Sequence, residues 1–169
     1  LPYEHKIFIA GNHDFAFEEI RHSTSESIMI PKGVIYLQDE MVNIDGINIY
    51  GSPWQPEFHN WAFNLPKGDK IKEKWDLIPN NADIIVTHGP CYGVLDNIIQ
   101  GMRVGCEELY LKVMDIKPKI HACGHIHWAY GMKTIENTTF INASSLDESY
   151  MYNNRPIVID YDEAMEYIF

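Results

Sequence analysis

The sequence predicts a single α/β domain over residues 1–169, in which helices are layered on a mixed β-sheet. Three observations favour this class. Apolar, β-branched runs alternate along the chain with segments of helical periodicity. Other runs come in pairs separated by short turns, which is typical of hairpins. The composition, 46% hydrophobic and 22% charged, is that of an ordinary globular protein.

Runs rich in Ile and Val define the expected strands. An Asp-Gly pair, Asp45-Gly46, separates two alternating runs and is a strong short-range signal for a hairpin. A second hairpin is expected across Glu136-Asn137. The predicted buried strands are Lys6–Ala10, Asp83–Thr87, Lys119–Cys123 and Ile157–Tyr161, and the hairpin strands are Met41–Ile44, Ile47–Tyr50, Gly131–Ile135 and Thr138–Ile141.

Three helices are expected between these strands. The clearest covers Glu107–Ile116, where Leu109, Val113 and Ile116 recur at helical spacing and Pro118 follows the end. The other two are predicted over Phe15–Arg21 and Ile71–Leu77.

Charge and composition exclude several classes of protein. Thirteen basic against 24 acidic residues give a net charge of −11, which argues against a broad nucleic-acid-binding surface. No apolar run approaches the ~20 residues of a membrane helix, so we expect no membrane association. The cysteines Cys91, Cys106 and Cys123 have no metal-like spacing, and we interpret them as reduced thiols of a cytoplasmic protein.

Histidines follow three of the predicted strands, each beside a glycine. The strand ends are followed by Gly11-Asn12-His13-Asp14, Thr87-His88-Gly89-Pro90 and Gly124-His125-Ile126-His127. Ligands of α/β sheets bind beyond the carboxyl ends of the strands, so neighbouring strands would bring all three clusters to one edge. The sequence therefore predicts a site there.

The chemistry of these side chains favours a metal. Imidazoles with an amide oxygen suit Mn, Fe, Zn or Ni better than Mg or Ca alone. His13 follows the potential ligand Asn12 and is a candidate general acid for a leaving group. Taken singly, each residue has an ordinary alternative, since a histidine at a strand end is often a surface residue and Asn12 or Asp14 can cap the following helix. His5, His22, His59 and His121 lack the strand-end context and are interpreted as structural or solvated.

With these motifs in view, the sequence resembles the calcineurin-like metallophosphoesterases, whose later motifs are GNH(D/E), a single His in a GH-like turn, and GHxH. The likeness to the metallophosphoesterase-domain-containing branch runs from about Ile7 to Asp160 and includes five stretches. They are Gly51-Ser52-Pro53-Trp54-Gln55-Pro56, Phe63-Asn64-Leu65-Pro66, Lys74-Trp75, Thr87-His88-Gly89-Pro90 and Arg103-Val104-Gly105-Cys106.

The resemblance implies a four-layer sandwich of two mixed sheets flanked by helices. It also implies a centre of two divalent metal ions, with manganese favoured, that hydrolyses phosphoesters, above all phosphodiesters of small, including cyclic, nucleotides. By position, Asn12, His88 and His125 would hold one metal, His127 would hold the other, and His13 would be the general acid.

The sequence departs from the family at two motifs. It contains no Asp-x-His triplet, and its only Gly-Asp, Gly68-Asp69, is out of order for the family's GD motif. The resemblance then implies that two strands and several carboxylate ligands are missing, that as few as one of the two metals is retained, and that activity is impaired. Two explanations are open: a C-terminal portion of a longer protein, which Leu1 favours, or a short protein that forms a homo-oligomer through an exposed sheet edge.

Candidate substrate contacts lie outside the histidine clusters. Trp54 belongs to an aromatic-rich segment, residues 53–65 with Trp61, that either walls the substrate or covers the core. Arg103 is a candidate phosphate clamp or an ordinary solvated arginine. Asn142, Ala143 and Ser144 follow another strand end and are candidates for the same site.

Three functional classes stay open on the sequence alone. The first is a phosphodiesterase for small nucleotides, and the second is a non-catalytic metal- or nucleotide-binding protein, or a site completed by a partner. The third is a nuclease or protein phosphatase of the same superfamily. The acidic charge argues against the nuclease, because phosphate backbones require a basic track.

Overall fold

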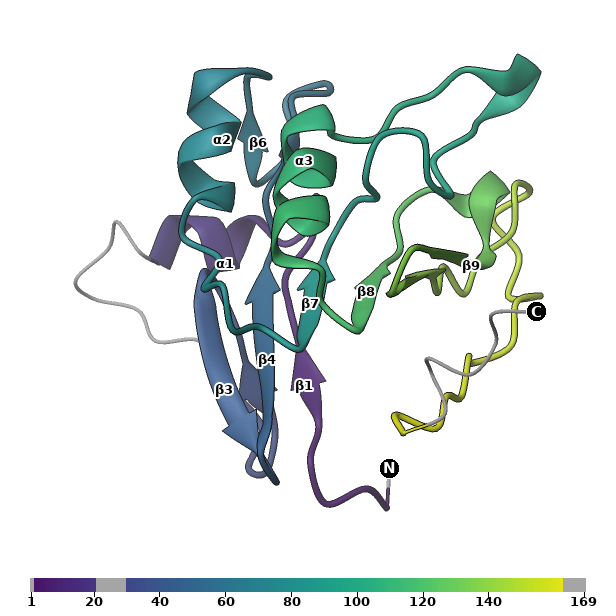
Figure 1. The fold of residues 1–169 in the computed structure, drawn as a ribbon. Helices are drawn as coiled ribbons and strands as arrows, with labels where there is room; N and C mark the ends of the chain where they lie inside the picture. Colours follow the sequence, from purple (N-terminus) through teal and green to yellow (C-terminus); the bar gives the residue numbers. More distant parts are fainter. Residues whose placement is uncertain (1, 21–29, 163–169) are drawn as a thin grey trace.

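A six-stranded mixed sheet forms the centre of the structure, a computed structural model that describes residues 2–20 and 30–162 (Figure 1). Its strand order is β3-β4-β7-β8-β10-β9. The strands are β3 (Glu40–Ile44), β4 (Ile47–Ser52), β7 (Ile84–Thr87), β8 (Ile120–Cys123), β10 (Thr138–Asn142) and β9 (Gly131–Ile135).

Smaller elements surround this sheet. Two short parallel pairs are formed by β1 (Ile7–Phe8) with β2 (Ile35–Tyr36), and by β5 (Gln55–Pro56) with β6 (Asn64–Leu65). The helices are α1 (Phe15–Ile20), α2 (Asp69–Trp75) and α3 (Glu107–Ile116), with 3₁₀ turns η1 (Ile99–Gly101) and η2 (His127–Ala129).

The four inner strands of the large sheet are parallel. Strand β7 pairs in parallel with β4 and β8, and β8 pairs in parallel with β10, whereas β3 and β9 are antiparallel edges. The arrows of β4 and β7 accordingly point to the same end of the molecule in Figure 1. This arrangement confirms the predicted mixed sheet and brings the carboxyl ends of the inner strands to one edge.

Both predicted hairpins are confirmed, and their turns explain why. Asp45 (φ 52°) and Gly46 (φ 90°) occupy the left-handed region that a two-residue turn between β3 and β4 requires. Glu136 (φ 49°) begins the corresponding turn between β9 and β10.

Helices α2 and α3 lie on one face of the sheet (Figure 1). Helix α3 has the predicted bounds and ends where Lys117 adopts a left-handed conformation (φ 55°) before Pro118. Its Leu109 and Val113 are buried against the sheet core. Helix α2 begins and ends two residues before the predicted range Ile71–Leu77, and buries Ile71 and Trp75.

One predicted strand is wrong. Residues Ile157–Tyr161 form no strand, although Ile157, Ile159 and Tyr161 pack on Ile120 and Ile141 of the sheet. The alternation of apolar side chains was a true signal of one-sided burial, but the backbone of this segment pairs with no strand in the described residues. The predicted strand Lys6–Ala10 shortens to β1, and Arg21 and His22 lie outside the described residues.

The structure tests several other predictions only in part. The described residues show one large sheet and two small ones, so the second mixed sheet of a four-layer sandwich stays a prediction, as does pairing of an edge with another chain. Within the described ranges, no helix is long and apolar enough to cross a bilayer. Cys91, Cys106 and Cys123 are free, buried thiols.

A buried hydrogen-bond network lies beneath the edge where the strands end. Thr87 Oγ1 donates to the Gly89 carbonyl (2.7 Å), so its oxygen accepts the N–H at Nε2 of His121 (2.9 Å). The other ring nitrogen, Nδ1, faces the Cys91 thiol at 3.8 Å. Burial lowers the pKa of His121 from 6.5 to about 3 and raises the pKa of Cys91. His121 is therefore a neutral core residue, consistent with its structural interpretation.

This burial predicts acid sensitivity. Between pH 6.5 and about 3 the unfolded chain binds a proton at His121 and the folded chain does not, so the free energy of unfolding falls as the pH falls. The variant His121→Gln removes this proton. The free energy of unfolding is measured by urea denaturation between pH 4 and 8 and plotted against pH. For the variant, the slope of this plot should be shallower than for the wild type by up to about 1.4 kcal/mol per pH unit. Equal slopes in both proteins would contradict the assignment, whatever their absolute stabilities.

Candidate active site

The turn after β1 is fixed by the carboxylate of Asp14. Its Oδ2 accepts a hydrogen bond from the backbone N–H of Gly11 (2.7 Å), and its own N–H donates to the Gly11 carbonyl (3.0 Å). The turn buries Asn12, which is 5% exposed, and leaves the neighbouring His13 exposed at the site. One short motif thus presents two side chains in different environments.

Asn12 meets His88, which follows β7. The Asn12 amide oxygen Oδ1 lies 2.7 Å from His88 Nε2, and the backbone N–H of Asn12 lies 3.3 Å from the same nitrogen. Gly11 makes this approach possible, because a Cβ there would lie 2.6 Å from the His88 ring. Two segments that are 76 residues apart in sequence are joined at this point.

His125 completes the cluster from the end of β8. The Gly124 N–H donates to the His88 carbonyl (3.0 Å), and His125 itself adopts a left-handed conformation (φ 68°). Its ring centroid lies 4.5 Å from that of His88. The backbone after β8 therefore aims the His125 ring back toward β7.

Burial keeps both of these rings neutral. The pKa of His88 is lowered to about 3 by burial and then by the nearby His125 and His13. The pKa of His125 is lowered to about 4, again by burial first and then by His127 and His13. Neutral imidazoles offer a free ring nitrogen, which is the form that binds metals.

His127 lies farther along the site, at the start of η2. Its Nδ1 is buried and has no hydrogen-bond partner among the described residues. The rings of Trp128 and Tyr150 adjoin it, with centroids at 6.5 and 4.9 Å. A buried nitrogen without a hydrogen-bond partner at such a site indicates that a water, an ion or a ligand binds there.

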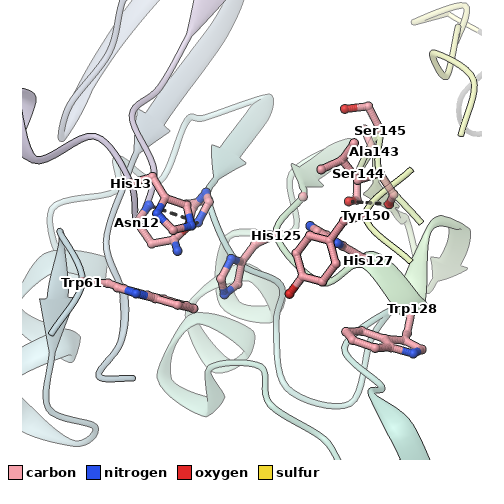
Figure 2. Close-up of a pocket in the computed structure, with 13 residues that line it drawn as sticks. Asn12, His13, Trp61, His125, His127, Trp128, Ala143, Ser144, Ser145 and Tyr150 are labelled. Atoms are coloured by element: carbon pink, nitrogen blue, oxygen red, sulfur yellow. Dashed lines mark hydrogen bonds between the residues drawn. The ribbon is translucent and has the colours of Figure 1, made fainter. Parts of the chain in front are cut away.

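These side chains line one cavity of about 480 Å³, in the size range of small-molecule sites (Figure 2). The sequence analysis predicted Asn12, His13, His88, His125 and His127, and the structure brings all five together. Among the described residues the lining includes no Asp, Glu, Lys or Arg side chain. Its members are Asn12, His13, Trp61, His88, Gly124, His125, His127, Trp128, Ala143, Ser144, Ser145, Leu146 and Tyr150.

Three candidate substrate contacts lie outside this lining. Arg103 donates to Asp96, a fully buried carboxylate, at 3.0 Å. Trp54 donates to Asp39 at 3.0 Å and is partly buried against the core. Asn142 is fully buried and positions the site from beneath, because its amide donates to the Ile126 carbonyl (2.9 Å) and its oxygen accepts from the Ser144 N–H (3.1 Å).

The neighbours of Asn142 do line the cavity, as does one ring of the aromatic-rich segment. Ala143 and Ser144 border it, in agreement with their place after a strand end, and so does Trp61. Sequence analysis missed Trp128 and Tyr150. The adjacency of Trp128 to His127 was a usable signal, whereas Tyr150 reaches the site through the folding of a loop that has no motif.

The cluster has donor atoms of the kind that divalent metals bind. Asn12 Oδ1, His88 and His125 offer one amide oxygen and two neutral imidazoles within a single cluster. A second metal does not fit equally well, since His127 is an isolated donor. Across the described residues, no three His, Cys, Asp or Glu side chains are grouped to hold a metal.

Comparison with known proteins gives relatives over nearly the whole chain, although no family model matches it. Metallophosphoesterase domain-containing protein 1 of Homo sapiens is 44% identical and aligns with 95% of this chain and 56% of its own length. A UPF0046 protein of Caenorhabditis elegans is 36% identical over 95% of this chain and 47% of its own length. The chain therefore spans about half the length of these curated relatives.

A solved crystal structure shares the fold. It covers 82% of this chain and 56% of its own chain with a TM-score of 0.58, at 15% sequence identity. The fold of the covered part of this chain is thus found in an experimental structure.

The contact between Gly11 and His88 allows a direct test of whether Asn12, His88 and His125 bind a metal. In Gly11→Ala the added Cβ must displace the His88 ring, so the affinity for Mn²⁺ should fall by about tenfold or more, as for other changes that shift a ligand. Isothermal titration of the purified chain measures this. Gly89→Ala is the matched control, because its Cβ would lie 3.9 Å from His125, an ordinary contact. Equal losses in both variants would refute a specific role for Gly11.

Proposed function

This chain belongs to the family of the metallophosphoesterase domain-containing proteins, its relatives over 95% of its length, and we propose that it binds divalent metal and hydrolyses phosphodiester bonds of small nucleotides. The observation that carries the proposal is the convergence of Asn12, His13, His88, His125 and His127 on one cavity. Three separate strand ends supply these residues, and packing of a core alone would not require that.

The chain's own residues divide into holding and reacting groups. Asn12, His88 and His125 would hold a divalent metal such as Mn²⁺, which when bound polarises a phosphoryl oxygen and lowers the pKa of bound water. The second metal of the family would have His127 as its donor, and the described residues supply too few ligands to assign it a role. Impaired activity of this chain alone belongs to the proposal for that reason.

His13 is placed to handle the proton of the leaving group. It is exposed at the cavity while His88 and His125 are partly buried, and its ring lies 5.2 Å from that of Trp61. The pKa values of the partly buried His88 and His125 rings are lowered to about 3 and about 4, so neither is protonated near neutral pH. We assign His13 as the general acid that protonates the leaving oxygen.

The charge of the cavity favours a diester over a monoester. No Lys or Arg belongs to the described lining, so a dianionic monoester would meet few compensating charges. A diester carries a single charge and exposes two organic groups, which suits a cavity with aromatic walls. The same charge argument, with the net charge of −11, weighs against a nuclease.

A second candidate function is metal or nucleotide binding without turnover, or turnover after a partner completes the site. The observation that favours it is the lack of carboxylates in the described lining. Metal content separates the candidates: two Mn²⁺ per chain after loading and desalting would support a complete site, and a loss of metal in His88→Ala would place it at this cluster.

The role of His13 predicts a dependence on the leaving group. His13→Ala should lower kcat by about 10²-fold or more for a nucleoside methyl phosphate, whose alkoxide needs a proton, and far less for a p-nitrophenyl ester, whose leaving group does not. Hydrolysis is followed with Mn²⁺ by chromatography and by absorbance. His59→Ala is the control, since His59 is also exposed and near Trp61 but lies outside the cavity lining. A uniform loss on both esters would exclude His13 as the acid.

A further inference from the structure

Two large aromatic side chains border the cavity on the side away from the metal cluster. Trp128 is 42% exposed and Tyr150 is 69% exposed, although each ring also adjoins His127. Figure 2 shows both rings on one side of His125 and Trp61 on the other. Exposed rings of this size gathered at a cavity mark a binding surface more often than scattered exposed residues do.

Tyr150 is held in place by the carboxylate of Asp147. Asp147 Oδ1 accepts from the N–H groups of Ser149 (2.8 Å) and Met151 (3.0 Å), and the Asn153 amide donates to its Oδ2. These hydrogen bonds, that of Met151 first, lower the pKa of Asp147. Tyr150 between them adopts a left-handed conformation (φ 60°), which is uncommon for a large residue. The strained backbone conformation of Tyr150 is therefore part of the loop structure that places its side chain at the cavity.

The same loop is tied to the floor of the site. The Asn154 amide donates to the carbonyls of Ser144 (2.9 Å) and Leu146 (3.0 Å), which follow β10. The Tyr130 hydroxyl donates to the Arg155 carbonyl (2.9 Å), which connects the loop to the segment after η2. These hydrogen bonds thus connect the loop that carries Tyr150 with the floor of the site and with the segment that follows Trp128.

The opposite wall is fixed independently. The Ala62 N–H donates to the Asn12 carbonyl (3.0 Å), and the Phe63 N–H donates to Glu18 of α1 (2.9 Å), so Trp61 is anchored directly to the turn that carries His13. Its ring lies against His13 and His125 and has less free surface than Tyr150. Trp61 therefore borders the reacting groups, and the Trp128–Tyr150 side has room for a group farther from the phosphorus.

We infer that Trp128 and Tyr150 form a stacking subsite for the nucleobase of the substrate, with Asp147 as the positioning residue for Tyr150. The inference rests on the proposed function, since it names the part of the substrate that this side of the cavity binds. Flat aromatic faces bind bases by stacking and tolerate different bases, and the described lining offers this side no charged group to bind a second phosphate. The predicted base contact thereby moves from Trp54, which packs against the core outside the cavity lining, to Trp128 and Tyr150.

The subsite can be tested without metal and without turnover. Adenosine, which has a base and no phosphate, should shift the Trp128 indole resonance of the metal-free chain in an NMR titration, whereas ribose should not. Tyr150→Ala should weaken adenosine binding about tenfold. Tyr150→Phe should retain it, and Asp147→Ala should weaken it because the loop no longer holds the ring. Tyr152→Ala is the matched control, an 84% exposed tyrosine two residues away that does not line the cavity.

A substrate pair adds a second readout. Thymidine 5′-p-nitrophenyl phosphate and methyl p-nitrophenyl phosphate share a leaving group and differ in the base. With Mn²⁺, Tyr150→Ala should raise KM for the thymidine ester about tenfold, with kcat and the methyl ester little changed.

The outcomes separate the two proposals. Adenosine binding that is lost in Tyr150→Ala, without any hydrolysis, would support the subsite and count against the phosphodiesterase. Equal binding of ribose, or adenosine binding unchanged in both Tyr150→Ala and Asp147→Ala, would overturn the subsite even if the chain hydrolyses both esters.

Discussion

The approach of Asn12 to His88 is the contact on which the site depends, because it joins a turn of the N-terminal segment to the end of a central strand 76 residues later. Other features follow from it. Residue 11 must lack a side chain so that the His88 ring fits, and Asp14 closes the turn that aims Asn12 inward. The segment that bears Trp61 is fastened to the Asn12 carbonyl. The wall of the cavity and its donor atoms are therefore positioned by one junction, and a change there alters binding and reaction together.

The chemistry of the site and the stability of the sheet draw on the same burial. Desolvation keeps His88 and His125 neutral and so able to donate to a metal, and it keeps His121 neutral within the Thr87–His121–Cys91 network beneath them. Because these rings are neutral at pH 7, His88 and His125 can donate to a metal. The same lowered pKa values reduce the free energy of unfolding at acid pH, because the unfolded chain binds protons at these rings and the folded chain does not. His13 differs because its turn leaves it exposed. Histidine can therefore have two different roles at this site, because His88 and His125 are desolvated and His13 is exposed.

The sequence was sufficient where the signal is local. Strands β7 and β8, helix α3 and both hairpins follow from short apolar runs, a proline stop and turn residues, and the convergence of the histidines follows from parallel strands ending at one edge. Contacts between segments that are distant in the sequence could not be predicted in this way. The apolar alternation of Ile157–Tyr161 indicated burial on one side but not whether a partner strand lay beside it. Arg103 and Trp54 looked available because their partners, Asp96 and Asp39, are identified only in the fold. The position of Tyr150 at the cavity could not be predicted from the sequence, because it depends on the hydrogen bonds of Asp147.

The cavity is nearly uncharged in a chain whose net charge is −11, and this contrast limits what it can select. An acidic surface repels polyanions before they reach the site. Inside, neutral imidazoles and an amide stabilise a phosphate only weakly, so under the proposed function the attraction for the phosphoryl group would come mainly from a bound cation. Affinity for the rest of the substrate must then come from the rings that border the cavity. The proposed substrate, a small monoanion with an aromatic base, is consistent with these features, whereas a nucleic-acid backbone is repelled by the acidic surface and a phosphorylated serine or threonine side chain has no ring to stack.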